Sequence, residues 1–281
     1  MNGKELIWLD RETGEIEPAY GEFRSMEQIQ SSAKYLANEK RQKFESDFTW
    51  IIFEYGKELF PNLKEKHLTR LIYLSTFCDY NGMLPPKKIL KEKLDLSSKY
   101  WSEFMKEMKE REIIIEQDGK LYLSQKFFAK GSLTTTHSHT RLFNKFIRDI
   151  YEKCDNIKTM NQIAYLYRLI PFVNRRTNMV CANPNEQDPE RVHPITLGEF
   201  CDMVGYDKKN ARRLAADLLE LKCNGQNLIG FFVTNLNQTT WRIVVNPRIY
   251  YGGENDNIYK QQLELLMKYN QDDANNTKLL L

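Results

Sequence analysis

The residues best suited to binding chemistry form a short basic cluster in the second half of the chain. The cluster combines cationic and amide side chains: Lys208, Lys209, Asn210, Arg212 and Arg213. Arginine pairs with guanine and asparagine with adenine in the major groove of DNA, and lysine neutralises phosphates. The cluster therefore predicts the start of a helix that reads duplex DNA; a surface helix whose charges serve only solubility is the alternative.

An earlier segment has a similar but weaker pattern. Its outward positions include Lys99, Ser102 and Lys106, but Glu103 stands where the later segment has Arg213. A carboxylate at that point repels phosphate unless it accepts a hydrogen bond from a cytosine amine. We expect this first helix to bind DNA less tightly, or to serve in dimerisation.

Further candidate DNA contacts lie outside the two long helices. They are Lys87 and Lys88 on a short helix of the first copy, and Asn237, Gln238 and Arg242 around a hairpin of the second. Contacts of this kind predict an affinity that falls steeply with salt, because each neutralised phosphate releases counterions.

Catalytic and metal-binding patterns are weak. The pair His137 and His139 has no carboxylate at ligand spacing, and the sequence has no glycine-rich phosphate loop or nucleophile elbow. The five cysteines are widely spaced and never form a CxxC pair, which suits a reducing compartment. We expect no enzyme activity, no metal and no cofactor.

Composition limits the possible classes of protein but does not identify the function. The chain has 281 residues, a formal net charge of +3 and a hydrophobic content of 41%, enough for two small cores. Such a mild positive charge neither requires nor excludes a nucleic-acid partner. We expect a cytoplasmic protein without a membrane partner, since no apolar run approaches the roughly 20 residues of a membrane span and the start lacks a signal-peptide core.

The elements that would position these residues occur twice. Residues 86–108 align without a gap on residues 196–218, and residues 121–131 align on residues 243–253. An internal duplication follows, with two copies of one domain.

In each copy, one helix has a clear apolar stripe. The stripes follow i, i+3, i+4, i+7 spacing and comprise Trp101, Phe104, Met105 and Met108, then Ala211, Leu214, Ala215 and Leu218. A further helix is expected before each short helix, at residues 68–80 and 161–173, and a two-stranded hairpin after each long helix. Three helices and a hairpin in this order predict a winged helix, a helix-turn-helix variant. The expected fold is mainly α with small β hairpins (α+β), as tandem winged-helix domains.

The predicted organisation has five parts. They are an N-terminal hairpin and connector (1–47), a first winged-helix domain (48–135), a linking helix (136–156), a second winged-helix domain (157–254), and a C-terminal amphipathic helix with a frayed tail (255–281). Between residues 174 and 194 the second copy carries about seventeen extra residues, rich in Asn, Pro and charge, which predict a loop insertion.

Two short motifs resemble a known family. The opening WLDRETGEIE at residues 8–17 and the run IVVNPRIYYGG at residues 243–253 are similar to the Firmicute plasmid replication protein L family and related phage proteins. Those proteins generally carry a single winged helix, so the second copy is a departure. Tandem winged helices also resemble theta-type plasmid initiators, in which one copy dimerises and the other grips repeated origin sites. The resemblance implies a protein of a bacterial mobile element.

Three functions remain open. A replication initiator would bind repeated duplex sites and recruit host replication proteins, and a transcriptional regulator would bind an operator and block or recruit polymerase. A winged-helix protein-interaction module is the third. Duplex DNA, a second copy of the chain, and host replication or transcription proteins are the expected partners.

Overall fold

The computed structural model describes residues 7–9, 16–18, 47–131, 139–223, 225–233, 241–247 and 249–251. Contacts divide the chain into two units, residues 1–46 and residues 47–281. In the first unit, strand β1 (Ile7–Leu9) pairs antiparallel with β2 (Ile16–Pro18). These strands fall where the sequence predicts a hairpin.

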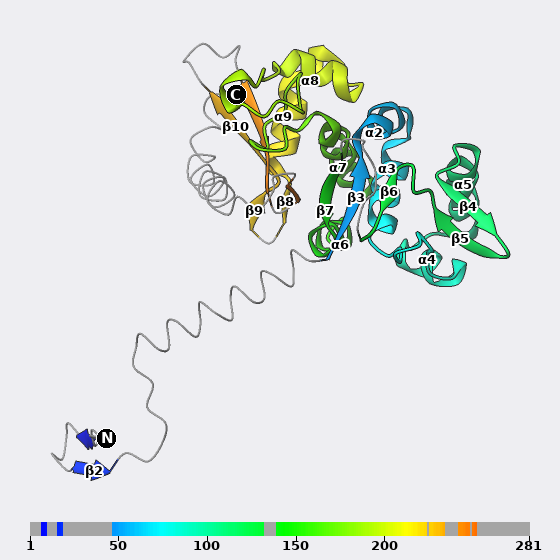
Figure 1. Cartoon of the computed structure of the whole chain (residues 1–281), viewed down its shortest axis with the longest axis horizontal. Helices are drawn as coiled ribbons and strands as arrows, with labels where there is room; N and C mark the ends of the chain where they lie inside the picture. The colour runs from blue at the N-terminus through cyan, green and yellow to red at the C-terminus, as the bar shows by residue number, and fades with distance from the viewer. Residues whose placement is uncertain are drawn as a thin grey trace. The chain divides into compact units, whose positions relative to one another are not determined.

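The second unit combines α-helices with small antiparallel sheets, as expected for an α+β protein (Figure 1). Its first part, residues 47–131, is called repeat 1. Repeat 1 contains β3 (Phe48–Ile52), α2 (Phe53–Leu59), η1 (Phe60–Asn62), α3 (Glu65–Ser75), α4 (Lys87–Lys93), α5 (Ser98–Glu110), β4 (Ile114–Gln117), β5 (Lys120–Leu123) and β6 (Phe128–Ala129).

Residues 139–251 are called repeat 2. Its helices are α6 (Asn144–Glu152), α7 (Ile157–Leu169), η2 (Ile170–Phe172), η3 (Pro189–Arg191), α8 (Leu197–Val204), η4 (Lys208–Asn210) and α9 (Ala211–Glu220). Its strands are β7 (His139–Phe143), β8 (Lys222–Cys223), β9 (Gln226–Asn227), β10 (Ile229–Val233), β11 (Trp241–Val245) and β12 (Tyr250–Tyr251). Within the described residues, every helix is too short or too polar to cross a membrane.

Matching hydrogen bonds show that the two repeats are built alike. In repeat 1 the backbone N–H of Leu123 donates to the carbonyl of Gly82 at 2.7 Å, and in repeat 2 that of Val245 donates to Asn178 at 3.0 Å. Gly82 and Asn178 both have positive φ, +77° and +53°. The next residue of each repeat then forms an antiparallel bridge to the hairpin. Each repeat therefore has a short bridged segment beside its hairpin, at Met83 in repeat 1 and at Met179 in repeat 2.

The turn between the last two helices also matches. The backbone N–H of Leu96 donates to the carbonyl of Lys91 at 3.3 Å, and that of Tyr206 donates to Cys201 at 2.8 Å. This bond closes the loop from α4 to α5 in repeat 1 and from α8 to α9 in repeat 2. The gap-free alignment of residues 86–108 with residues 196–218 therefore corresponds to equivalent backbone positions.

A four-stranded antiparallel sheet in the order β12-β7-β3-β6 joins the repeats. Strands β3 and β7 pair in the middle with Trp50 opposite Arg141, and Figure 1 shows them side by side. On the outer flanks Ala129 lies opposite Trp50 and Tyr251 lies opposite Arg141. The register is the same on both sides, so the sheet has an approximate two-fold symmetry that exchanges the repeats.

The helices behind the sheet complete the junction. Thr49 and Ile51 of β3 are fully buried, while Phe48 and Trp50 on the alternate face are half-buried. The Thr49 hydroxyl donates to the carbonyl of Ser75 at the end of α3, which places α3 on the buried face. Helix α3 packs in turn against α7, its counterpart in repeat 2.

Arg168 on α7 fixes repeat 2 to repeat 1. Its side chain is only 4% exposed. The guanidinium donates to the carbonyls of Phe60 (3.2 Å), Leu63 (2.8 Å) and Val204 (2.8 Å), and forms an ion pair with Glu65 at 3.0 Å. A buried charge is tolerated only when it is paired and hydrogen-bonded in this way, so these contacts hold the end of η1 and the start of α3 against α7.

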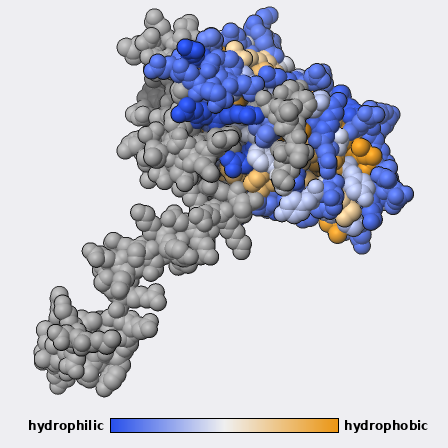
Figure 2. Space-filling view, in the orientation of Figure 1, coloured by the Kyte–Doolittle hydropathy of each residue, from blue (hydrophilic) through white to orange (hydrophobic). Residues whose placement is uncertain are grey.

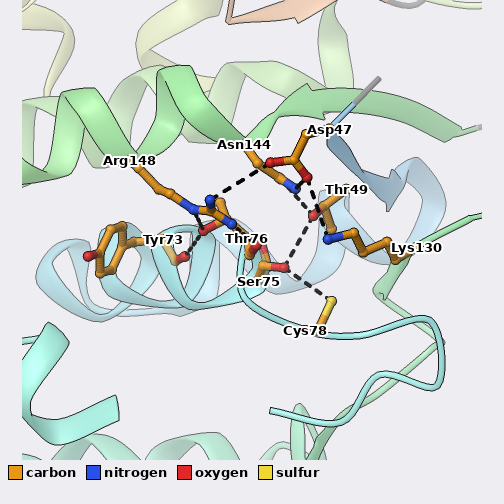
Figure 3. A network of polar contacts seen from close by, with 9 residues as sticks. All are labelled: Asp47, Thr49, Tyr73, Ser75, Thr76, Cys78, Lys130, Asn144 and Arg148. Carbon is orange, nitrogen blue, oxygen red and sulfur yellow. Dashed lines mark hydrogen bonds and ion pairs between the residues drawn. The ribbon is translucent and has the colours of Figure 1, made fainter. Parts of the chain in front are cut away.

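A second polar network crosses the junction at the start of β3 (Figure 3). The Asn144 amide donates to the Asp47 carboxylate at 2.8 Å and accepts from the Thr49 hydroxyl at 2.8 Å. Arg148 donates to the Thr76 hydroxyl at 3.0 Å and lies 3.8 Å from the Asp47 carboxylate. The network therefore connects β3 and the end of α3 in repeat 1 to α6 in repeat 2.

Two sequence expectations differ from the structure here. The linking helix expected over 136–156 is in its described part a strand, β7, followed by α6, because the segment before Asn144 extends along β3 instead of coiling. The first helices, expected at 68–80 and 161–173, begin earlier. In repeat 2 the Asn156 side chain accepts from the backbone N–H of Thr159 and starts α7 there.

The insertion of repeat 2 also lies later than expected. The N–H of Leu84 in repeat 1 and that of Val180 in repeat 2 donate to equivalent hairpin positions. After these residues, repeat 1 reaches the N-cap Pro86 through Pro85 alone, whereas repeat 2 reaches the N-cap Thr196 through residues 181–195. The extra residues therefore follow Val180 instead of beginning at residue 174.

Gly82 tests the hairpin junction, with Gly119 as a matched control. Both have positive φ, +77° and +72°, but a Cβ on Gly82 would lie 2.8 Å from the carbonyl oxygen of Leu123, whereas a Cβ on Gly119 meets nothing within 4 Å. We expect Gly119→Ala to cost about 1 kcal/mol of unfolding free energy, and Gly82→Ala about 2–4 kcal/mol. Urea unfolding of both variants measures the difference, and equal losses would contradict the close approach.

Candidate nucleic-acid interface

The basic cluster of repeat 2 begins at a capped turn. The carboxylate of Asp207 accepts from the backbone N–H of Lys209 at 2.9 Å, which starts the η4 turn that leads into α9. This side-chain cap satisfies an amide that helix geometry leaves free.

Helix α9 has one buried and one exposed face. Leu214, Ala215 and Leu218 are at most 1% exposed and face α7 and α8. Arg212 and Arg213 on the opposite face are exposed, and so are Lys208, Lys209 and Asn210 of the η4 turn before the helix. The amphipathic pattern thus produces the expected cationic surface.

Ion pairs divide these cations into two kinds. Lys208 Nζ lies 2.7 Å from a carboxylate oxygen of Asp202, and this hydrogen bond raises the pKa of Lys208. Arg213 Nε lies 4.0 Å from Asp217. Among the described residues, no carboxylate forms an ion pair with Lys209 or Arg212. Lys209 and Arg212 are therefore the cations of this face that are most available to a ligand.

The corresponding face of α5 in repeat 1 is differently balanced. Phe104, Met105 and Met108 are buried as predicted, but Trp101 is half-buried. Ser97 occupies the N-cap position of α5 without a side-chain hydrogen bond to the first turn, unlike Asp207 before η4. The outward residues Lys99, Ser102 and Lys106 are exposed.

Carboxylates neutralise much of the α5 surface. Glu103 accepts a hydrogen bond from Lys64 at 3.1 Å, which lowers the pKa of Glu103, and Lys66 lies 4.0 Å away. Lys106 pairs with Glu110 at 3.8 Å. Glu103, the carboxylate expected to repel phosphate, is thus held by Lys64 at the N-cap of α3 and by Lys66 in its first turn. These partners are too distant in sequence to be recognised from helix spacing.

Helix α4 carries the other predicted lysines of repeat 1. Glu116 of β4 contacts both Lys87 and Lys109, and these hydrogen bonds, Lys109 first, lower the pKa of Glu116 to about 2. Lys88, the next residue on α4, is exposed and forms no ion pair within the described residues. Of the two lysines, Lys88 alone remains available.

The hairpin candidates of repeat 2 are not placed. Asn237 and Gln238 lie outside the described residues. The backbone of Arg242 pairs with that of Phe232 in the β10–β11 hairpin. Its role as a DNA contact stays a prediction, as do those of Asn237 and Gln238.

The described residues offer little for catalysis. No group of three His, Cys, Asp or Glu side chains among them is arranged to hold a metal ion. His137 lies outside the described residues, and the ring of His139 packs edge-on against Trp50 at 4.8 Å. Burial raises the pKa of the Cys78 and Cys181 thiols to about 11, which keeps them protonated at neutral pH.

Figure 2 shows a mostly hydrophilic surface in this view, with small separate hydrophobic spots on the described part. Comparison of the chain with protein-family models, with curated proteins and with solved structures finds no match. Arguments about function therefore depend on the geometry described above.

His67 on α3 is a buried group that sequence reasoning missed, because its partner Glu107 is forty residues away. The side chain is 1% exposed, its Nδ1 contacts a carboxylate oxygen of Glu107, and its ring packs on Phe104. Burial lowers the pKa of His67 although Glu107 acts in the opposite direction.

This burial predicts a pH dependence of stability. The unfolded chain protonates His67 near pH 6.5 while the folded chain resists it, so stability falls as pH drops below about 6.5. Unfolding free energies at pH 7.5 and 5.5 should therefore differ more in the wild type than in His67→Gln. Identical differences would rule out His67 as the cause.

Proposed function

We propose that the chain binds double-stranded DNA sequence-specifically, with each repeat acting as a winged helix and α9 as the main recognition helix. In each repeat, the last three of four α-helices are followed by a hairpin, and an isolated backbone bridge at Met83 or Met179 joins the segment before the last two helices to that hairpin. A helix-turn-helix unit places its last helix in the major groove, where arginine and asparagine can contact base edges.

The observation that carries this proposal is the free cationic face of α9. Arg212 projects from α9, whose other face is anchored by Leu214 and Leu218, and Lys209 lies on the η4 turn that leads into this helix. Among the described residues, neither cation forms an ion pair. Asn210 lies between them in sequence and is exposed as well. In this arrangement Arg212 and Asn210 read base edges, and Lys208, Lys209 and Arg213 bind phosphates.

The biological role we propose is initiation of replication on a bacterial plasmid or phage. It is supported by the resemblance of residues 8–17 and 243–253 to plasmid replication proteins. An initiator would bind origin DNA through α9 and recruit host replication proteins. Binding to an operator is the alternative, and loss of element DNA synthesis on deletion of the protein would separate the two.

The cationic asymmetry predicts unequal effects of substitution. We expect Arg212→Ala with Arg213→Ala to weaken duplex binding by about 1–3 kcal/mol through the lost base contact of Arg212, and further through the lost phosphate contact of Arg213. Lys99→Ala with Lys106→Ala, which also removes two cations, should have a much smaller effect because Lys106 is paired with Glu110 and three glutamates balance the three lysines of α5. Fluorescence anisotropy with duplexes from the DNA flanking the gene, at low salt, measures both.

Equal losses in the two double variants would remove the asymmetry from the proposal. Failure of the wild-type chain to bind any duplex at low salt would instead favour a protein-interaction module. Thermal unfolding of each variant controls for loss of structure.

A further inference from the structure

The two repeats carry their positive charge on different helices. Helix α4 of repeat 1 has four lysines against one glutamate, and α5 has three lysines against three glutamates. In repeat 2, α8 has two carboxylates and no cation, whereas η4 and α9 together have four cations against two carboxylates. The excess of positive charge thus lies one helix earlier in repeat 1.

The comparison is valid because these helices occupy equivalent positions. The N–H of Leu90 donates to the carbonyl of Pro86 at the start of α4, as that of Phe200 donates to Thr196 at the start of α8. Equivalent residues just after α4 and α8 also have positive φ, +48° at Asp95 and +68° at Gly205. The same scaffold therefore presents two different charge distributions.

Two lysines of α4 are placed beside the turn. Lys88 and Lys91 border a shallow depression of about 350 Å³, together with Glu92, Asp95 and Leu96. Lys88 forms no ion pair among the described residues, and Lys91 Nζ donates to the hydroxyl of Ser98 at 2.8 Å. Among the described residues, neither amine forms an ion pair, whereas Lys106 and Lys109 of α5 are each paired with a glutamate.

The two helices of a helix-turn-helix contact DNA differently. The last helix enters the groove and reads base edges, whereas the preceding helix crosses the sugar-phosphate backbone. Contacts to phosphate set position and affinity without carrying sequence information. Positive charge on α4 therefore suits backbone binding, and positive charge on α9 suits readout of bases.

We propose that repeat 1 is a sequence-independent phosphate clamp, acting through Lys88 and Lys91 of α4, and that sequence discrimination comes from α9 of repeat 2. This inference rests on the proposed duplex binding. If the clamp acts in this way, part of the salt dependence of binding comes from α4. Helix α5 then makes no major contribution to base recognition.

The test compares two duplexes. One is selected by the wild-type chain from a randomised pool, and the other is a scrambled duplex of the same length and composition. Lys88→Gln with Lys91→Gln should weaken binding to both duplexes by the same factor, leaving their affinity ratio unchanged. The slope of log affinity against log salt should fall in magnitude by about 2, one for each lost phosphate contact.

Lys106→Gln with Lys109→Gln is the matched control, because it removes two lysine charges from the neighbouring helix of the same repeat. We expect its salt slope to stay at the wild-type value. Arg212→Ala should lower the affinity ratio of the two duplexes while changing the scrambled duplex less. Lys88→Gln alone, at an exposed residue, should reduce the slope by about 1 and guards against misfolding of the double variant.

The outcomes separate the two proposals. If the wild-type chain binds no duplex from the randomised pool and does not bind the scrambled duplex, the proposed function itself is contradicted. If the wild type binds but the Lys88 and Lys91 variants keep its slope, or change the affinity ratio, the clamp is wrong and duplex binding stands. A slope change in the α5 control equal to that of the α4 variant also contradicts the assignment.

Discussion

The rest of the second unit depends on the pairing of β3 with β7. Five residue pairs, from Phe48 opposite Phe143 to Ile52 opposite His139, put the first strands of both repeats in one sheet. Each of these strands also pairs with the closing strand of its own repeat, β6 or β12. Because α3 and α7 pack together behind this sheet, the buried contacts of Arg168 and Asn144 form where the repeats meet. The helices that carry the candidate site pack against α7, which forms part of this centre.

The orientation of the cationic face follows from packing in each repeat. Burial of a leucine-sized side chain contributes about 1.5–3 kcal/mol, so Leu214 and Leu218 together set the rotation of α9 more firmly than its surface ion pairs do. With that face buried, Arg212 has to point away from α7 and α8. The same packing in repeat 1 exposes a surface on which Glu103 is bound by Lys64. Among the described residues, the scaffold thus leaves Lys209 and Arg212 of repeat 2 without an ion pair, whereas Lys106 and Lys109 of repeat 1 are paired with carboxylates.

Local features were predictable from the sequence, and features made by distant partners were not. The stripe of Phe104, Met105 and Met108 follows from helical spacing, and its burial is confirmed. The two-stranded hairpin after α5 was also predicted from a short-range pattern, and β4 pairs with β5 there. The duplication was visible because equivalent positions keep similar side chains over residues 86–108 and 196–218.

The central sheet was missed for a physical reason. Strand β7 is five residues long and leads directly into α6, so its apolar positions merge with those of the helix. Its partner β3 lies about ninety residues away in sequence, and such pairing leaves no local pattern. The carbonyls bound by Arg168 and the lysines that hold Glu103 are likewise brought together only by the fold. The charged residues on a helix surface could therefore be predicted from the sequence. Which of them form ion pairs with distant residues could not be predicted.

The central claim is that the exposed face of α9 contacts duplex DNA. Acetylation of lysines by a water-soluble reagent, followed by mass spectrometry with and without a selected duplex, tests it residue by residue in the full chain. Lys209 should become protected when duplex is added, while Lys106, whose side chain is 76% exposed on α5, should react at an unchanged rate. Binding of duplex with no protection of Lys209 would contradict the account.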